Sequence, residues 1–369
     1  MTMLVSYWDA GWILLDVTDP ARPTVVRDHD FPSPNIAGVS PPEGNAHQAF
    51  WSSDRRFVIA SSEDFAPFRL SGDIVSGPFA GQQFNTVVAS NTRAITPQQP
   101  LIGGRGGGRP PRGGGLPTYY VGLACDPLPQ APTTNAVALV QRGTCTFAVK
   151  GQNVQAAGYT AGLVFNSAAV GNCEGASGMS VTERLTIPLI GVVPRSLGFA
   201  ILGVSGYNPA NCPTGANPSL PAVGTRGADI LIESEFDAWG YVHLLDGATF
   251  REIGQYAVPE ALTPGFSTSF GRLSVHEVKT DSRPGMNLAY VSYYDAGARV
   301  LQFGPGGIRE VGSFIDVGGN NFWGTFPHYL GTDPNIRPIA QTTERPLLLF
   351  SDKDYGLYIL RYTGPESAP

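Results

Sequence analysis

The stretch that decides the fold is Ser292-Tyr293-Tyr294-Asp295-Ala296-Gly297, which lies between the apolar runs 288–291 and 298–301. The order Ser-x-x-Asp-(Ala/Tyr)-Gly recurs at residues 6–11 and 351–356, again between two apolar runs. An aspartate side chain can hydrogen-bond its own backbone in a turn, and glycine accepts the positive φ that a tight hairpin needs. The pattern therefore predicts a repeated strand–turn–strand unit.

A fourth copy of the pattern is interrupted. It begins as Ser62-Glu63-Asp64 after the apolar run 57–60 and resumes as Phe236-Asp237-Ala238-Trp239-Gly240 before another apolar run. The residues between the two halves predict a second domain inserted into one turn. The expected division is 1–65 and 229–364 for the repeats, 66–228 for the insertion, and 365–369 for a short tail.

The apolar runs are four or five residues long and rich in Val, Ile, Leu, Tyr and Phe, which is typical of strands and too short for helices. With the strands expected before and after each unit, the pattern gives four antiparallel strands at a recurrence of roughly 40–60 residues. This predicts a mainly β protein, a β-propeller with at least four visible blades; an ordinary β-sandwich is the alternative. Both end units lack a strand, so we expect an incomplete propeller, either a fragment or a chain that closes by self-association.

The composition fits a globular protein with many turns. The chain has 369 residues, 46 Gly, 32 Pro and a formal net charge of −6. This acidic balance argues against a nucleic-acid binder, and no run reaches the roughly 18 apolar residues of a transmembrane segment. The Gly- and Arg-rich tract 103–115 lacks the Gly-Lys-Ser/Thr ending of a phosphate loop and is expected as a surface loop. Residues 1–4 lead directly into a strand without a signal peptide, so we expect any secretion signal in a missing N-terminal part.

The insertion contains nearly all of the helical pattern in the chain. A strand at 137–141 is followed by a helix at 147–157, which ends before Gly158, a residue suited to a helix C-terminus. An apolar strand follows at 161–166, and a second strand and helix are expected at 187–202. The insertion is therefore predicted to be an α/β domain.

These residues resemble the protease-associated (PA) domain, whose recognisable stretches occur here. They are Leu139-Val140-x-Arg142-Gly143-x-Cys145-x-Phe147-x-x-Lys150, a helix ending in Ala157-Gly158, a strand ending in Asn166, and Ile187-Pro188-Leu189-Ile190. The resemblance covers roughly residues 70–228 and implies a domain without catalytic residues of its own, which binds peptides or gates access to a neighbouring domain. The outer repeat resembles the LVIVD-repeat propellers of bacterial surface and secreted proteins, some of which carry an inserted PA domain.

All four cysteines, Cys125, Cys145, Cys173 and Cys212, lie in the insertion. An even number in one domain indicates disulfides and an oxidising compartment, with three pairings open. A zinc site is the alternative, but the insertion has no Cys-x-x-Cys pair and no histidine. The PA-domain resemblance implies a Cys125–Cys145 pair, which leaves Cys173 with Cys212.

Histidine offers the one metal-ligating pattern. Three of the five histidines, His47, His276 and His328, are expected at the start of the innermost strands of three blades, which line a central channel. Neutral imidazoles that converge there would suit zinc or copper, whereas the alternative is that each ring bonds a neighbouring backbone group. His29 and His243 lack this phasing and are expected as surface or strand residues.

The sequence contains no peptidase motif. There is no Gly-x-Ser-x-Gly, and His276-Glu277 is followed by Val278-Lys279-Thr280 rather than by the second histidine of a zinc helix. The repeat aspartates are assigned to turn capping rather than to a carboxylate site: Asp9, Asp64, Asp295 and Asp354. We therefore expect an extracellular or surface protein that binds proteins or peptides without catalysis and without a firmly indicated cofactor. The alternatives are a metal-dependent enzyme with a histidine site in the channel and an accessory partner of a peptidase.

Overall fold

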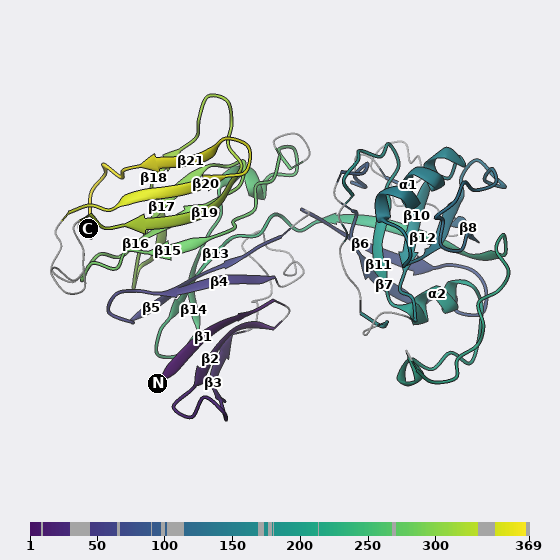
Figure 1. The fold of residues 1–369 in the computed structure, drawn as a ribbon, viewed down its shortest axis with the longest axis horizontal. Coiled ribbons are helices and arrows are strands. Elements are labelled where there is room, and N and C mark those ends of the chain that lie inside the picture. The colour runs from purple at the N-terminus through teal and green to yellow at the C-terminus, as the bar shows by residue number, and fades with distance from the viewer. Residues whose placement is uncertain are drawn as a thin grey trace. The chain divides into compact units, whose positions relative to one another are not determined.

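A computed structural model describes residues 1–8, 10–29, 45–64, 67–89, 91–96, 100–101, 114–168, 173–175, 179, 181–212, 214–267, 271–330 and 344–366. Asp9 and residues 102–113, which hold most of the Gly- and Arg-rich tract, lie outside these ranges. The chain divides into two compact units (Figure 1). One comprises Met1–Pro67 with Asp237–Pro369, and the other comprises Phe68–Phe236.

Within the described residues, the first unit consists of four antiparallel sheets with three, four, four and three strands. The first sheet holds β1 (Thr2–Tyr7), β2 (Gly11–Asp16) and β3 (Thr24–His29). The second holds β4 (Ala46–Trp51), β5 (Phe57–Ser62), β13 (Val242–Asp246) and β14 (Glu252–Tyr256). The third holds β15 (Val278–Thr280), β16 (Leu288–Ser292), β17 (Ala298–Gly304) and β18 (Gly307–Phe314), and the last holds β19 (Phe322–His328), β20 (Leu347–Asp352) and β21 (Gly356–Leu360). A short 3-10 helix, η2 (Pro259–Leu262), follows β14. The predicted mainly β fold is confirmed.

The repeated turns form the hairpins that the sequence predicts. Gly11 and Gly356 begin the second strand of their hairpins and Gly297 directly precedes β17; their φ angles are 87°, 88° and 88° in the order Gly11, Gly297 and Gly356. The aspartates act less uniformly than expected. Asp295 accepts the backbone N–H of Arg272 at 2.5 Å, so it caps a neighbouring segment rather than its own turn. In the last copy the turn is capped by Asp352, whose Oδ1 accepts the N–H of residue 354 at 2.8 Å.

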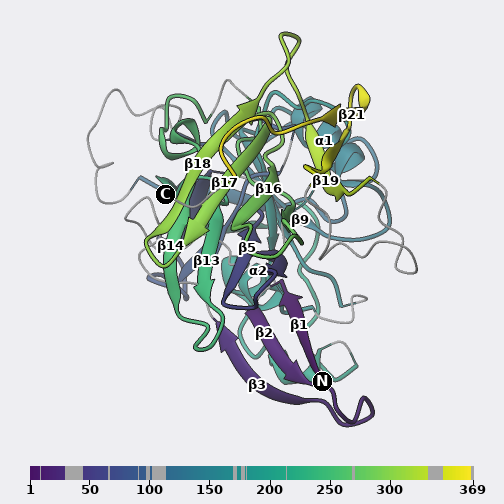
Figure 2. The ribbon, with the colours of Figure 1, turned by 90° about the vertical axis from the view of Figure 1, so that its left-hand side faces the viewer.

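The four sheets of the first unit follow one another in chain order (Figure 2). Apolar side chains fill the space between neighbours. Between the third and fourth sheets, for example, Leu288 and Tyr290 belong to the same buried cluster as Phe322 and Phe350. Each sheet therefore has one or both of its faces covered by neighbouring sheets, and this contact removes its rows of apolar side chains from water.

The second unit is one seven-stranded sheet with two helices. Its strands, in the order β11-β10-β9-β8-β12-β6-β7, are β6 (Phe68–Ile74), β7 (Gln83–Thr86), β8 (Leu116–Tyr120), β9 (Val137–Gln141), β10 (Ala161–Phe165), β11 (Leu189–Val193) and β12 (Arg226–Phe236). The helices are α1 (Phe147–Ala156), α2 (Arg195–Ile201) and a 3-10 turn η1 (Pro209–Asn211). The predicted strand–helix–strand order is confirmed, and Gly158 follows α1 with a φ of 80°.

The two edges of this sheet meet. Beyond β7, the N–H of Gly191 donates to the Val87 carbonyl at 2.6 Å, and the N–H of Ala89 donates to the Leu189 carbonyl at 2.8 Å. The isolated bridge between Val88 and Ile190 has the same antiparallel sense. The strands thus close into a barrel without a long free edge, which limits pairing with foreign strands. Across the described residues of both units, no helix has the length and apolar character needed to cross a membrane.

Candidate metal centre

Two of the predicted histidines lie together in the first unit. His47 is on β4, His276 lies two residues before β15, and their ring centroids are 4.2 Å apart. The Nδ1 of His47 bonds the main-chain carbonyl of His276 at 2.8 Å. The same carbonyl accepts the hydroxyl of Ser61 at 2.9 Å. Strands β4 and β5 are therefore joined to the segment before β15 at the point where the rings meet.

The hydrogen bonds fix the tautomer of both rings. The Nδ1 of His276 bonds the carbonyl oxygen of Trp323 at 2.5 Å, just as that of His47 bonds the His276 carbonyl. A carbonyl oxygen only accepts, so each Nδ1 must carry the proton. In the neutral form of each ring, Nε2 then has the lone pair with which imidazole binds a metal.

Both Nε2 atoms face the carboxylate of Glu63, which directly follows β5. The distances are 3.6 Å from His47 Nε2 to Glu63 Oε2 and 3.9 Å from His276 Nε2 to Glu63 Oε1. Both exceed the length of a direct hydrogen bond. Glu63 and His276 are 3% and 2% exposed, and His276 Nε2 has no hydrogen-bond partner among the residues that the structure describes. The Nε2 lone pairs therefore face the Glu63 carboxylate in a buried space. A cation bound between them would remove the repulsion.

Burial sets the electrostatics of the group. Loss of water raises the pKa of Glu63, against the hydrogen bond that the Tyr294 hydroxyl donates to it. Burial also lowers the pKa of His276 to about 4, with a smaller contribution from the nearby His47. The His276 ring is consequently neutral near pH 7.

Aromatic rings enclose this group. Trp323 lies 4.0 Å from the His276 ring, and Tyr294 lies 5.3 Å from it. Tyr294 has a φ of 35°, a backbone conformation that bulky residues rarely adopt and that is found at functional sites. On the outer sides of these rings, the Lys353 ammonium is 4.3 Å from the Trp323 ring and the Arg272 guanidinium is 5.2 Å from the Tyr294 ring.

The structure does not bring His328 to the other two histidines. It is the last residue of β19 and is exposed, whereas Trp323, near the start of the same strand, contacts His276. The expectation that His328 begins its strand is thus corrected, because β19 starts at Phe322. At about 3.3 Å per residue, that shift moves His328 roughly 15–20 Å along the strand.

The sequence reasoning missed Glu63 as a site residue. It appeared only as the second residue of the interrupted turn copy 62–64. The one available signal was that Glu63, directly before the aspartate of its copy, stands where two other copies have the aromatic residues Trp8 and Tyr294. Its partners His47 and His276 come from different sheets, and no local pattern reports such an approach.

The two remaining histidines form a separate pair. His243, on β13, is fully buried, and its Nδ1 lies 2.8 Å from Glu252. His29, on β3, lies 3.7 Å from the same carboxylate. The ring of Trp12 stacks on His29 and contacts His243. Both histidines are strand residues, and His243 is in the core rather than on the surface.

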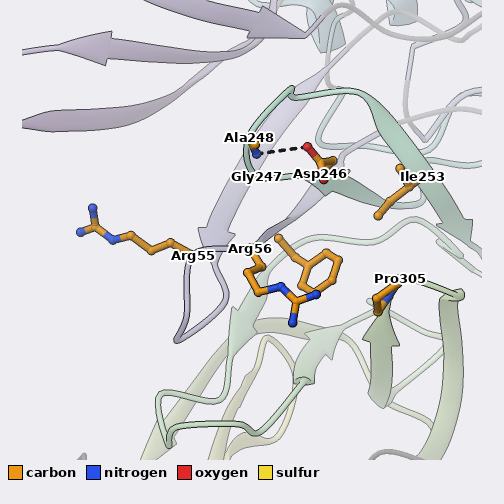
Figure 3. Close-up of a pocket in the computed structure, with 8 residues that line it drawn as sticks. Arg55, Arg56, Asp246, Gly247, Ala248, Ile253 and Pro305 are labelled. Carbon is orange, nitrogen blue, oxygen red and sulfur yellow. Dashed lines mark hydrogen bonds between the residues drawn. The ribbon is translucent and has the colours of Figure 1, made fainter.

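A surface cavity lies at the other end of β5 (Figure 3). It measures about 480 Å³ and is lined by Arg55, Arg56, Phe57, Asp246, Gly247, Ala248, Ile253 and Pro305. The Asp246 carboxylate is engaged by its own turn, since it accepts the N–H of Ala248 at 3.1 Å. At about 3.3 Å per strand residue, the cavity is roughly 20 Å from Glu63 and does not belong to the histidine group.

In the second unit the four cysteines form two disulfides, Cys125–Cys145 and Cys173–Cys212. Glu174 lies beside the second pair, but both sulfurs are bonded to each other and offer no thiolate. The lysine of the PA-like stretch, Lys150, is buried, and its Nζ donates to the carbonyl of Leu123 at 2.5 Å. It thereby ties the loop before Cys125 to helix α1.

Comparison with known proteins identifies a family match for part of this chain. Residues 108–201 match the PA domain family. No curated protein matches the chain.

Structural matches include BSAP, a zinc aminopeptidase from Bacillus subtilis (16% identity, TM-score 0.29, 51% of this chain and 35% of that chain). An aminopeptidase from Aneurinibacillus sp. strain AM-1 matches at 14% identity and TM-score 0.24, over 52% of this chain and 39% of that one. A psychrophilic subtilisin-like protease from Pseudoalteromonas sp. AS-11 matches at 10% identity and TM-score 0.27, over 53% of this chain and 37% of that one. The chain thus spans less than two fifths of these enzymes, and scores this low decide nothing about its fold or activity. What the comparison does establish, together with the strand–helix–strand order, is that residues 108–201 form a PA domain.

Proposed function

We propose that this protein is an extracellular or surface-associated binding protein for proteins or peptides, in which the first unit is a scaffold and the PA domain recognises the ligand. The two disulfides support an oxidising compartment. The observation that carries the proposal is the way in which the PA domain is inserted.

The insertion leaves the host sheet intact. The chain passes into the inserted unit after β5 and comes back to the first unit before β13. These two strands are hydrogen-bonded neighbours, with Ser61 opposite Val242. At the junction, the N–H of Asp237 donates to the Pro67 carbonyl at 3.2 Å. The inserted unit then starts with its own pair, Phe68 opposite Phe236. A domain attached at two adjacent points is a separable module, which suits recognition.

We further propose that the first unit is an LVIVD-type β-propeller of at least four blades that is incomplete by itself. The sheets with three, four, four and three strands support this, because each is an antiparallel meander of the kind that makes a blade. Contacts between β4 and β15 and between β15 and β19 support it further, since these are the strands expected nearest the axis.

The two end sheets support self-association. Met3, Leu15 and Val25 pair across the first sheet, and Phe326, Leu349 and Ile359 pair across the last. The outer members of both rows are 46–63% exposed, whereas inner sheets cover such rows with a neighbour. We propose that a second copy packs on these rows. Sedimentation velocity should show a dimer that Ile359→Asp disrupts; a monomeric full chain at micromolar concentration would contradict it.

A metal-dependent enzyme is the second candidate, and the histidine–carboxylate group favours it. The donors His47, Glu63 and His276 all lie within 4.8 Å of one another. Two imidazoles and one carboxylate are the usual protein ligands of catalytic zinc.

The binding role is tested by selecting peptides from a random display library on the full chain. Affinities are then measured for the full chain and for a variant in which Gly-Gly replaces residues 68–236. Binding that requires these residues, with peptides recovered intact by mass spectrometry, supports the proposal. Binding retained by the deletion variant would overturn recognition by the PA domain, and cleaved peptides would favour the enzyme.

A further inference from the structure

We propose that His47, Glu63 and His276 are protein ligands of one divalent transition-metal ion, with zinc the ion best suited to this donor set. The inference supplies the site that the second candidate function needs, but it holds or fails independently of ligand binding by the PA domain and of any catalysis.

The spacing of the donor atoms fits such an ion. In a tetrahedral zinc site with bonds of 2.0–2.2 Å, two donor atoms are about 3.4 Å apart. The two histidine nitrogens are 3.6 and 3.9 Å from the Glu63 oxygens, and all three donors lie within 4.8 Å of one another. Movements of the side chains by roughly 1 Å or less would therefore complete the coordination.

The surroundings hold the ligands in the orientation that a metal requires. Each Nδ1–H is bonded to a backbone carbonyl, and hydroxyls of Ser61 and Ser292 donate to those same two carbonyls at 2.9 and 2.8 Å. Tyr294 donates its hydroxyl to the Glu63 carboxylate. Outer partners of this kind fix the tautomer of ligating histidines and are a regular part of metal sites.

The charge of the group also favours a cation. An ionised Glu63 carboxylate places a negative charge where Glu63 and His276 are almost fully buried, and a divalent ion bound there would neutralise it. Arg272 and Lys353 contact the Tyr294 and Trp323 rings and are exposed, so solvent weakens their electrostatic effect on Glu63 without removing it. They disfavour a bare cation and favour an anion, such as hydroxide or a carboxylate, as its fourth ligand.

The alternative explanation of this arrangement is a proton shared between His47 and Glu63, without a metal ion. Protonation of His47 would satisfy one nitrogen, but the distance of 3.6 Å to Glu63 is too long for a direct hydrogen bond. It would also leave the buried Nε2 of His276 without a partner, as it is in the structure. A metal ion satisfies both nitrogens and the carboxylate at once.

The test uses the full chain, purified without chelators and then reconstituted with Zn²⁺ and dialysed. Metal content is measured by mass spectrometry for the native chain and for Glu63→Gln, His276→Ala and His328→Ala. We expect about one zinc per native chain and per His328→Ala chain, and at least a tenfold loss in the two ligand variants. His328→Ala is the matched control, because His328 is a histidine of the same unit outside the group.

Two further measurements distinguish loss of the metal ligand from loss of the fold. Glu63→Gln keeps the size of the side chain and an acceptor for Tyr294, so its circular dichroism should match that of the native chain. Cobalt-substituted protein should show the visible absorption of a four-coordinate Co²⁺ ion, and that absorption should be lost in Glu63→Gln. A folded native chain that retains no zinc or cobalt after reconstitution, or equal retention in all four chains, would overturn the proposal and leave the shared proton.

Discussion

The Nδ1 of His47 donates to the main-chain carbonyl of His276 at 2.8 Å, so that two residues 229 positions apart hold their rings 4.2 Å from each other. This bond links β4 to the segment before β15, and together with the bond from His276 Nδ1 to the Trp323 carbonyl it turns both remaining nitrogens toward Glu63. The candidate metal centre is therefore a product of how neighbouring sheets are packed.

Tyr294→Phe should destabilise the first unit by roughly 2 kcal/mol, because it removes a hydrogen bond to the buried Glu63 carboxylate. It should also weaken metal binding by about 10–100-fold, the usual effect of losing an outer partner. Urea unfolding and zinc titration measure the two effects. Tyr355→Phe, at a position with 61% exposure, is the control and should change neither. Native stability in Tyr294→Phe would contradict the assigned contact.

The fold was largely predictable from the sequence, and the site only in part. Short apolar runs and the glycines at 11, 297 and 356 carry local information, so hairpins and strand–helix–strand order followed from them. Glu63 could not be identified, because its role depends on side chains from two other places in the chain. The barrel closure between Val87 and Gly191 could not be predicted either, since it joins strand β11 to an irregular segment about one hundred residues earlier in the chain.

Asp281→Asn should cost about 3–5 kcal/mol, the usual effect of breaking a buried ion pair. Asp281 and Arg283 are 0% and 2% exposed and pair at 2.7 Å. The hydroxyls of Tyr290 and Tyr329 donate to the same carboxylate at 2.7 and 3.0 Å. Denaturant unfolding of the first unit measures the loss. Asp19→Asn, an exposed carboxylate in the same unit, should change stability by less than about 0.5 kcal/mol.

The first unit should lose stability as the pH falls from about 4.5 toward 2. Burial alone raises the pKa of Glu252, but the hydrogen bond with His243 and the nearby His29 ring outweigh it and hold the pKa at about 2. A carboxyl whose pKa is lower in the folded state stabilises the fold above its ordinary pKa and loses that effect on protonation. The shift corresponds to at most about 3 kcal/mol. Melting temperatures between pH 6 and 3 should fall less steeply for Glu252→Gln; parallel profiles would contradict the assignment.

Replacing Cys125 and Cys145 together by serine should destabilise the PA domain alone. The disulfide closes a loop of 20 residues, for which about 3 kcal/mol of stability is expected. Calorimetry of the full chain should show the transition of the second unit at lower temperature and that of the first unit unchanged. A shift of both transitions would mean that the two units do not unfold separately.

X-ray absorption at the zinc edge of the reconstituted full chain tests the metal centre most directly. The account predicts two imidazole nitrogens and one or two oxygens at about 2.0–2.2 Å, with one imidazole missing in His276→Ala. A first shell of water oxygens only, a shell that contains sulfur, or a spectrum that His276→Ala leaves unchanged would contradict it.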